Sequence, residues 1–494
     1  MPEATDPGPG GSRATAGSRR RLLLALAATL AILAPIGFFW QQSLVPGDLS
    51  PMDMGYADFG GGPVAGEHAG HQRDLASFSV PADRKADVLF ELIARKEPIT
   101  IEGRGPVDGY TLNHTSPGPR ITARQGQLIQ VTLHNESVPD GVTLHWHGVD
   151  VPPSEDGVAG VTQDSVLPGQ SHVYKFVAVD AGTYWYHSHQ VSHEQVAKGL
   201  FGALVVSPAA GDVVAAVHTY DKVRTVNGQY GERRVDAAPG SEVRVRLINT
   251  DNGPMAAWVD GTPYRVAAVD GTDVNQPPVV ENKSVLVTAG GRIDLKLTVP
   301  RGSAVRIGLG GGPTTLVIGA GDAPQGPEPR ERVDLLSYGV PKALGLDPAK
   351  ATRHFEYRIG RRPGFFDGRP GLWWTINGHQ LPKVPMFMVA DGDVVRMTVR
   401  NESGQVHPMH LHGHHVVVLS RDGVAATGSP WWVDSLNVED HETYEIAFVA
   451  DNPGIWMDHC HNLQHAAQGL VTHLMYVGVG TTFHSGGAHH NKPE

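Results

Sequence analysis

The sequence predicts an all-β protein of three β-sandwich domains, preceded by one hydrophobic helix. Composition is the first observation: 60 Gly and 37 Pro among 494 residues, with 18% charged residues, favour short strands joined by turns. The second is an internal repeat with a T-x-N start, a polar turn containing Gly, and a closing Asn. The third is the alternation of apolar and polar residues in segments such as VRVRLI and VVRMTVR, which is typical of antiparallel strands.

The N-terminal segment predicts export or membrane anchoring. Residues 1–21 are polar and basic and end in three arginines, whereas residues 22–40 carry no charge. At ~1.5 Å rise per residue, this uncharged run spans about 29 Å of helix, which matches the hydrocarbon core of a bilayer. Arginines before an apolar span place the remaining chain outside the cytoplasm, and SRRRLL is similar to a twin-arginine export signal. We therefore expect a signal sequence or transmembrane anchor, and a protein that is membrane-anchored, secreted or periplasmic.

The repeat predicts the domain boundaries. Its three copies begin at Thr111, Thr225 and Thr375, so the starts are 114 and 150 residues apart. Residues 41–75, before the first domain, are rich in Gly, Pro, Met and His without an apolar period, which predicts a flexible linker. We place domain one at 76–208, domain two at 209–335, domain three at 336–480, and a His-containing tail at 481–494.

Histidine pairs distinguish domains one and three from domain two, which we interpret as a scaffold. Residues i and i+2 of a strand point to the same face, so each H-x-H pair directs two imidazoles to one side. Two such domains placed face to face would gather eight imidazoles around one cavity. This number exceeds what a single zinc ion uses and suits a cluster of copper ions. The four pairs are His145 with His147, His187 with His189, His410 with His412, and His459 with His461.

The single cysteine, Cys460, excludes an intrachain disulfide and lies between two of these histidines. Because His459 and His461 point towards the cluster, Cys460 points away from it, where His407 and His465 can join it. Two imidazoles and one thiolate form the blue-copper arrangement, which transfers electrons. The thiol is therefore linked to the cluster through one residue of backbone. Domain one has serine at the matching position, which predicts one such centre in the chain.

These motifs resemble those of the three-domain, laccase-like multicopper oxidases, and the resemblance covers residues from about 80 to 480. It implies a cupredoxin-like Greek-key sandwich in each domain and four copper ions. The family takes single electrons from a reducing substrate and reduces dioxygen to water. Matched position by position, the type 1 copper falls to His407, Cys460 and His465, and the type 2 copper to His145 and His410. The type 3 pair falls to His147, His187, His189, His412, His459 and His461.

Three further residues are candidates for tuning or proton supply. Leu470 occupies the family's axial position, where many relatives carry Met; because leucine offers no ligand, we expect a raised type 1 potential. Asp156 matches the acidic residue that relatives place near the cluster, but it also suits an ordinary Asp-Gly turn. Asp458, directly before His-Cys-His, is a candidate for relaying protons or tuning a ligand, or it contacts solvent.

Several other residues are open to two interpretations. His193, the counterpart of His465 in domain one, is interpreted as a structural histidine, and His414 and His415 as packed ones. Trp431 and Trp432 either border the substrate opening or pack within domain three.

We expect an oxidase that couples one-electron oxidation of a phenol or aromatic amine to four-electron reduction of dioxygen. The alternative is a metallo-oxidase acting on Cu(I), Mn(II) or Fe(II); Leu470 favours organic substrates, and the sparse methionine, 10 residues, argues against a specialised cuprous oxidase. A non-enzymatic cupredoxin-fold protein and a nitrite reductase or small electron carrier are more distant alternatives. Expected partners are the small-molecule or metal-ion reductant, dioxygen and, through an uncleaved N-terminal segment, the membrane. The net charge of −11 argues against nucleic acid.

Overall fold

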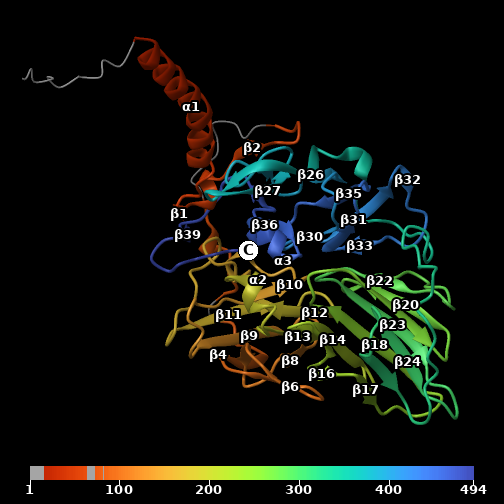
Figure 1. Cartoon of the computed structure of the whole chain (residues 1–494). Coiled ribbons are helices and arrows are strands. Elements are labelled where there is room, and N and C mark those ends of the chain that lie inside the picture. Colours follow the sequence, from red (N-terminus) through yellow and green to blue (C-terminus); the bar gives the residue numbers. More distant parts are fainter. Residues whose placement is uncertain (1–15, 64–72, 82) are drawn as a thin grey trace, which may run out of the picture. The chain divides into compact units, whose positions relative to one another are not determined.

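The computed structural model describes residues 16–63, 73–81 and 83–494, and strands form most of its regular structure (Figure 1). The chain divides into two compact units. One contains the described part of Met1–Val45 together with Pro363–Trp373, and the other contains Pro46–Arg362 and Trp374–Glu494.

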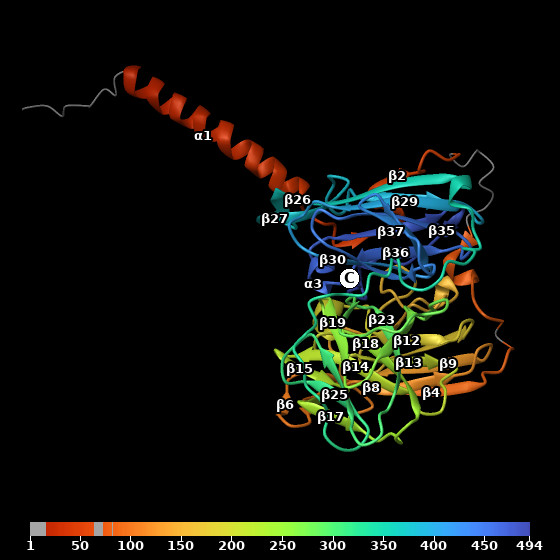
Figure 2. The ribbon, with the colours of Figure 1, turned by 90° about the vertical axis from the view of Figure 1, so that its right-hand side faces the viewer.

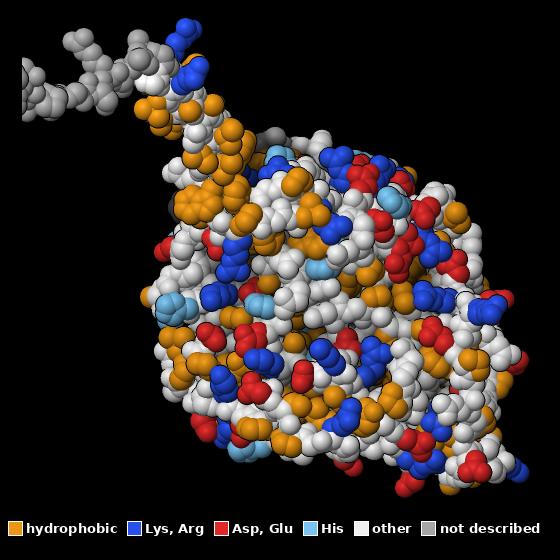
Figure 3. Space-filling model, viewed as in Figure 1, with side chains coloured by type: hydrophobic (Ala, Val, Ile, Leu, Met, Phe, Trp, Pro, Cys, Tyr) orange, Lys and Arg blue, Asp and Glu red, His pale blue; other side chains and the backbone are white. Residues whose placement is uncertain are grey.

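The first unit contains helix α1 (Ala16–Gln42). Hydrophobic side chains cover this helix (Figure 3), and the segment Ser18–Gln42 is long and apolar enough to cross a membrane. Such a helix is compatible with a signal sequence as well as with an anchor. Within the same unit, the Trp40 indole N–H donates to the carbonyl of Gly368 at 3.0 Å. Residues 1–15 of the predicted polar N-terminal segment lie outside the described residues.

Domain one contains two four-stranded sheets, with strand orders β10-β12-β13-β8 and β11-β9-β4-β7. Strand β13 pairs parallel to β8, and β4 pairs parallel to β9, so the sheets are mixed rather than purely antiparallel. The reason is that the parallel partners are distant in sequence and are reached by long connections. The strands are β4 (Val88–Lys96), β7 (Tyr110–Leu112), β8 (Gly118–Ala123), β9 (Leu128–Asn135), β10 (His145–His147), β11 (Ser171–Val177), β12 (Gly182–His187) and β13 (Phe201–Val206), with a separate hairpin of β5 (Ile99–Ile101) and β6 (Gly105–Val107).

Domain two has a seven-stranded sheet, β16-β15-β14-β18-β23-β20-β21, and a five-stranded sheet, β17-β25-β24-β19-β22. The strands are β14 (Val213–Tyr220), β15 (Val223–Val226), β16 (Gln229–Tyr230), β17 (Glu232–Val235), β18 (Glu242–Asn249), β19 (Met255–Asp260), β20 (Tyr264–Val269), β21 (Thr272–Asp273), β22 (Val285–Val287), β23 (Arg292–Thr298), β24 (Val305–Leu309) and β25 (Thr315–Ile318).

Domain three has a six-stranded sheet, β2-β28-β37-β36-β30-β34, and a seven-stranded sheet, β27-β26-β29-β35-β31-β32, in which β33 also pairs with β31. The strands are β26 (Arg353–Phe366), β27 (Arg369–Ile376), β28 (Pro385–Val389), β29 (Val394–Asn401), β30 (His407–Leu411), β31 (Val416–Arg421), β32 (Val424–Ala425), β33 (Trp432–Val433), β34 (Ser435–Val438), β35 (Thr443–Val449), β36 (Ile455–Cys460) and β37 (Val471–Tyr476).

Strand β29 illustrates how the sequence builds these sandwiches. Its buried residues Val395, Met397 and Val399 alternate with polar residues that face outwards. Burial of each such side chain contributes about 1.5–3 kcal/mol, which holds the strand in one register. The all-β prediction is confirmed, while the domain boundaries proposed above stay predictions.

Part of the predicted flexible linker is ordered. Strand β2 (Tyr56–Asp58) joins the domain-three sheet beside β28, and β1 (Asp48–Leu49) pairs with β39 (Ser485–Gly486) of the tail. Strand β3 (Arg73–Asp74) pairs with β38 (Val479–Gly480). Backbone hydrogen bonds to strands far away in sequence therefore order these parts of the segment that composition predicted to be a flexible linker. Residues 64–72 of the predicted linker lie outside the described residues.

Two short helices mark the region that carries the histidines. Helix α2 (Ser192–Gln195) follows the second pair of domain one, and α3 (Leu463–Ala467) follows the last pair of domain three. In Figures 1 and 2, strands β30 and β36 with α3 lie on the side of domain three that faces the other two domains. Four 3₁₀ turns complete the described helices: η1 (Pro51–Asp53), η2 (Leu75–Ser77), η3 (Pro153–Glu155) and η4 (Pro348–Lys350).

Candidate metal centre

Eight imidazoles converge between domains one and three. Strand pairing of β10 with β12 sets His145 opposite His187, and pairing of β30 with β36 sets His410 opposite His459. The second member of each pair follows two residues later on the same face. All eight are buried: His145, His147, His187, His189, His410, His412, His459 and His461.

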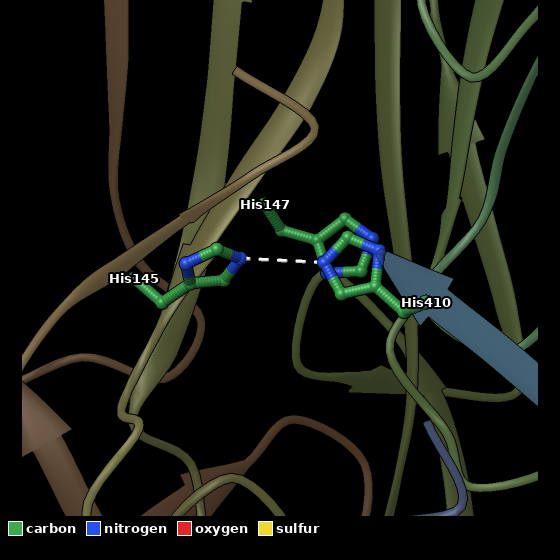
Figure 4. Close-up of side chains that lie close together, drawn as sticks. All are labelled: His145, His147 and His410. Atoms are coloured by element: carbon green, nitrogen blue, oxygen red, sulfur yellow. Dashed lines mark hydrogen bonds between the residues drawn. The ribbon is translucent and has the colours of Figure 1, made fainter. Parts of the chain in front are cut away.

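The nitrogens of these histidines form three groups, within each of which the ligand atoms lie within 4.8 Å of one another. Figure 4 shows the first group, in which His145 Nε2 lies 3.4 Å from His410 Nε2 and the rings of His147 and His410 stack at 3.7 Å. Every group combines histidines from both domains, so the centre requires the two domains to be assembled. The groups are His145, His147 and His410; His147, His187 and His461; and His189, His412 and His459.

Hydrogen bonds fix which nitrogen of each ring faces the centre. Five of the rings donate from Nδ1 to a carbonyl or a carboxylate, which leaves Nε2 directed inwards. The His147 ring has the opposite orientation: its Nε2 lies 3.1 Å from Asp434 Oδ1, and its Nδ1 has no hydrogen-bond partner among the described residues. Metal-binding histidines use this pattern, in which the rear N–H is held by the protein. The five rings are His145, His187, His410, His412 and His459.

Two buried carboxylates organise the rings. Asp156 accepts from His145 Nδ1 at 3.0 Å and from His412 Nδ1 at 2.9 Å, and thus joins domains one and three. Asp434 faces His147 and also forms a two-point ion pair with Arg292, at 2.7 and 2.5 Å. Burial raises the pKa of Asp434, but Arg292 and the neighbouring histidines outweigh burial and hold it well below its ordinary value.

The ring nitrogens fit metal ions. Burial lowers the pKa of seven of the cluster histidines, to about 3 for His459, so that these seven imidazoles are neutral and each offers a lone pair. The seven are His147, His187, His189, His410, His412, His459 and His461. His187 Nε2 and both nitrogens of His461 have no hydrogen-bond partner among the described residues. An unpartnered buried polar atom costs about 1–3 kcal/mol, which metal binding would offset.

The second centre is formed by His407, Cys460 and His465. The Cys460 sulfur lies 3.4 Å from His407 Nδ1 and 3.7 Å from His465 Nδ1, and the two nitrogens are 3.2 Å apart. Burial raises the pKa of the Cys460 thiol and lowers the pKa of His407 to about 3 and of His465 to about 4. A bound metal ion is therefore needed to hold the sulfur as thiolate. Leu470 is fully buried, and its carbonyl accepts from the Cys460 N–H at 3.2 Å.

Asp458 does not join the histidine cluster. Asp458 pairs with Leu411 of β30, and it precedes His459 in the strand. Because adjacent residues of a strand point to opposite faces, the Asp458 side chain points away from the cluster, into the domain-three sandwich. There it lines a cavity of about 30 Å³ together with Tyr357, and burial raises its pKa to about 8. This position lends no support to a proton relay into the histidine cluster and is not that of a solvent-exposed side chain.

The remaining histidines that the sequence singled out lie outside both centres. His193 contacts the Glu494 carboxylate, and His414 packs at 2.7 Å from the Tyr476 hydroxyl. His415 is more than a packed residue, because it lies 3.4 Å from both Asp150 and Asp434.

Sequence reasoning missed several residues around the centres. The tryptophan beside the sulfur-containing centre is Trp374, whose ring lies 4.8 Å from that of His407 and 4.4 Å from that of His465. Trp431 instead lines a cavity of about 210 Å³ between domains two and three. The one signal for Trp374 was its place directly before the third repeat, which begins at Thr375. Arg292 and Asp434 had no motif signal.

Comparison with known proteins agrees with this geometry. Two sequence profiles described as multicopper oxidase match residues 94–211 and 348–477. Laccase-2 of Botryotinia fuckeliana is 29% identical, covering 74% of this chain and 78% of that protein. Multicopper oxidase MmcO of Mycobacterium tuberculosis is 26% identical, covering 77% and 86%. The crystal structure of a multicopper oxidase from Pseudomonas thermotolerans superposes with a TM-score of 0.66 at 27% identity, covering 79% of this chain and all of that one. The expected cupredoxin-like architecture is thereby confirmed.

Proposed function

The chain belongs to the multicopper oxidase family and is a four-copper oxidoreductase that uses dioxygen; we propose that its reductants are phenols or aromatic amines, as in laccases. Bound copper supplies one-electron transfer and the reduction of dioxygen to water. The observation that carries the proposal is the position of Cys460. Its sulfur belongs to the centre on one strand face, while its chain neighbours His459 and His461 belong to the cluster on the other face.

The three nitrogen groups support an assignment of the ligands. His407, Cys460 and His465 would hold the type 1 ion, and His145 and His410 the type 2 ion. The type 3 pair would divide between His147, His187 and His461 on one side and His189, His412 and His459 on the other.

The protein's own contribution at the cluster is to orient these ligands. Asp156 holds one imidazole from each domain with its two oxygens, so both rings keep their Nε2 atoms towards the cluster. Asp434 holds the Nε2 atom of His147 rather than its Nδ1 atom, and Arg292 neutralises the charge of Asp434. We propose Asp156 as a positioning residue on this basis; its role in proton supply stays a prediction from the family resemblance.

Electrons would enter through His465. This side chain is 8% exposed whereas His407 is fully buried, so His465 is the ligand nearest to solvent. Leu470 would supply no ligand to the type 1 ion, and a type 1 site without an axial ligand is expected to have a higher potential. A high potential suits phenols. Among the described residues, every group of three His, Cys or carboxylate ligands belongs to the two centres and Asp156, and none is separate from them, as a binding site for a substrate metal ion would be.

The proposed site of action is outside the cytoplasm, because α1 has the length and composition of a signal or an anchor and follows three arginines. Fractionation of cells producing the full chain would test this proposal. A carbonate-resistant membrane fraction indicates an anchor, a soluble extracytoplasmic fraction indicates a cleaved signal, and cytoplasmic protein would contradict the proposal.

Oxygen uptake by the copper-loaded protein tests the substrate class. Phenols, aromatic amines, Cu(I), Mn(II) and Fe(II) would be compared side by side, each over a range of concentrations below and above its KM. We expect the organic reductants to give the higher kcat/KM. Turnover confined to the metal ions would favour the metallo-oxidase alternative, and absence of turnover with four coppers bound would contradict an oxidase.

A further inference from the structure

A guanidinium lies beside the type 1 site on its Trp374 side. Arg361, in β26, places its Cζ 5.2 Å from the centre of the Trp374 ring, and that ring contacts both His407 and His465. The guanidinium and the two histidines therefore contact the same tryptophan ring, at the point where electrons would enter.

The Arg361 guanidinium has no carboxylate within 4.0 Å and no side-chain hydrogen bond among the described residues. Three other arginines in the same sheet differ: Arg353 pairs with Asp393 at 2.7 Å, Arg400 with Glu402 at 3.8 Å, and Arg396 with Glu445. A half-buried guanidinium without a counter-ion has its donors available, and its planar fork of donors matches a carboxylate or sulfonate.

Neutral amides complete the surroundings of His465. Asn462 Nδ2 lies 3.3 Å from His465 Nε2, and the Gln468 amide oxygen accepts the Trp374 indole N–H at 3.0 Å. Both amides belong to or flank helix α3 and carry no charge. Neither amide therefore carries a charge that would offset the positive charge of Arg361 beside Trp374.

The net charge of the chain, −11, acts in the opposite direction and repels anions at long range. Salt screens exposed charges beyond about 8 Å at physiological ionic strength, so a guanidinium in contact with the substrate outweighs the distant acidic residues. The same guanidinium repels Cu(I), Mn(II) and Fe(II) from the entry point.

We propose that Arg361 forms an anion subsite beside His465, so that the preferred reductants are phenols bearing a carboxylate or sulfonate. This inference rests on the proposed phenol oxidase function. Each phenol would lose one electron through His465 and its hydroxyl proton to solvent, which leaves a phenoxyl radical. Four such oxidations supply the electrons, and four protons from solvent complete the conversion of one O₂ into two waters.

The test compares vanillate with vanillyl alcohol, which share one phenolic ring and differ in the charge of the side group. Copper-loaded wild type, Arg361→Gln and Arg361→Lys would be assayed for kcat and KM with each substrate. Arg362→Gln is a matched control, because this neighbouring guanidinium bonds instead to Gln380 and to the Gly378 carbonyl. Blue absorbance would confirm an intact type 1 site in every variant.

In Arg361→Gln we expect the vanillate to vanillyl alcohol ratio of kcat/KM to fall roughly three- to tenfold, through KM for vanillate. Arg361→Lys should recover part of the ratio, and Arg362→Gln should keep it. A change of potential would affect both phenols, so the ratio isolates the charge contact. In wild type, KM for vanillate should rise with salt while that for vanillyl alcohol stays constant.

An unchanged ratio in Arg361→Gln with intact blue absorbance would overturn the anion subsite but leave the oxidase function standing. If that variant fails to fold, the salt dependence of the wild-type KM tests the subsite instead. A KM for vanillate that does not change with salt concentration would overturn the subsite. Failure of the copper-loaded wild type to oxidise either phenol would overturn the proposed function itself.

Discussion

Asp156 of domain one accepts a hydrogen bond from His412 of domain three, with 2.9 Å between Oδ2 and Nδ1. Its other oxygen accepts from His145 at 3.0 Å, and the carboxyl group is 1% exposed. A single carboxylate therefore sets the rotation of one imidazole from each of the two domains that make up the cluster.

Removal of this carboxylate should weaken copper binding or activity at the cluster. We expect Asp156→Ala to lower copper content at the cluster or oxygen uptake by about 10- to 100-fold, as for other residues that orient metal ligands. The blue absorbance of the type 1 site should remain. Metal analysis and oxygen uptake measure these effects, and the exposed Asp108→Ala is the control. Full copper content and full activity in Asp156→Ala would refute the positioning role.

The buried ion pair between Arg292 and Asp434 should be costly to break. Both side chains are at most 1% exposed, so Arg292→Met leaves the Asp434 charge buried without its partner. We expect a loss of about 3–5 kcal/mol in the free energy of unfolding, measured with denaturant on the metal-free protein. Arg265→Met, an exposed position in domain two, serves as the control. A loss below about 1 kcal/mol in Arg292→Met would mean that Asp434 is stabilised without Arg292.

Leu470→Met should lower the type 1 potential, because the thioether can reach towards an axial position that leucine leaves without a ligand. Redox titration of the blue absorbance measures the change. Leu463→Met, at a buried position in the neighbouring helix α3, controls for the effect of a methionine in this core. An unchanged or higher potential in Leu470→Met would show that residue 470 does not act at the axial position.

The metal-free protein should lose stability on acidification. Burial lowers the pKa of His473 to about 4, and neither ring nitrogen has a partner among the described residues. The unfolded chain binds a proton at this residue near pH 6.5, whereas the folded chain stays neutral. The stabilising contribution is thus complete above pH 6.5 and is lost as the pH falls towards 4, by about 3 kcal/mol.

Unfolding curves across this pH range test the assignment. His473→Gln should lose less stability than wild type between pH 6.5 and 4, because it removes one titrating group. The exposed His441→Gln should follow the wild-type curve. Identical pH slopes for His473→Gln and wild type would contradict a neutral buried His473.

The alternation of strand residues predicted most of the site. The H-x-H spacing placed two imidazoles on one face, and the same rule turned Cys460 to the other face, as the register opposite Met409 shows. Applied to Asp458, that rule also points its side chain away from the cluster, so adjacency to His459 was a poor guide to function.

Contacts between segments far apart in sequence could not be predicted from the alternation of strand residues. Domain two has no histidine pairs and was interpreted as a scaffold, yet its Arg292 and Asp270 form part of the network around Asp434. Isolated Arg and Asp residues carry no periodic signal, and their partners lie more than 140 residues away. Trp374 and Arg361 were missed for the same reason, since the packing of one domain-three sheet against the other brings the Trp374 ring to His407 and His465.

The central claim is that Cys460 connects electron entry to dioxygen reduction. The most direct measurement is oxygen uptake with a phenol by copper-loaded Cys460→Ser, together with its copper content. We predict retention of the cluster copper, loss of blue absorbance and a fall in oxygen uptake by at least about 1,000-fold, because serine removes the thiolate on which electron transfer depends. Phenol-dependent oxygen uptake at the wild-type rate in a variant without blue absorbance would contradict the account.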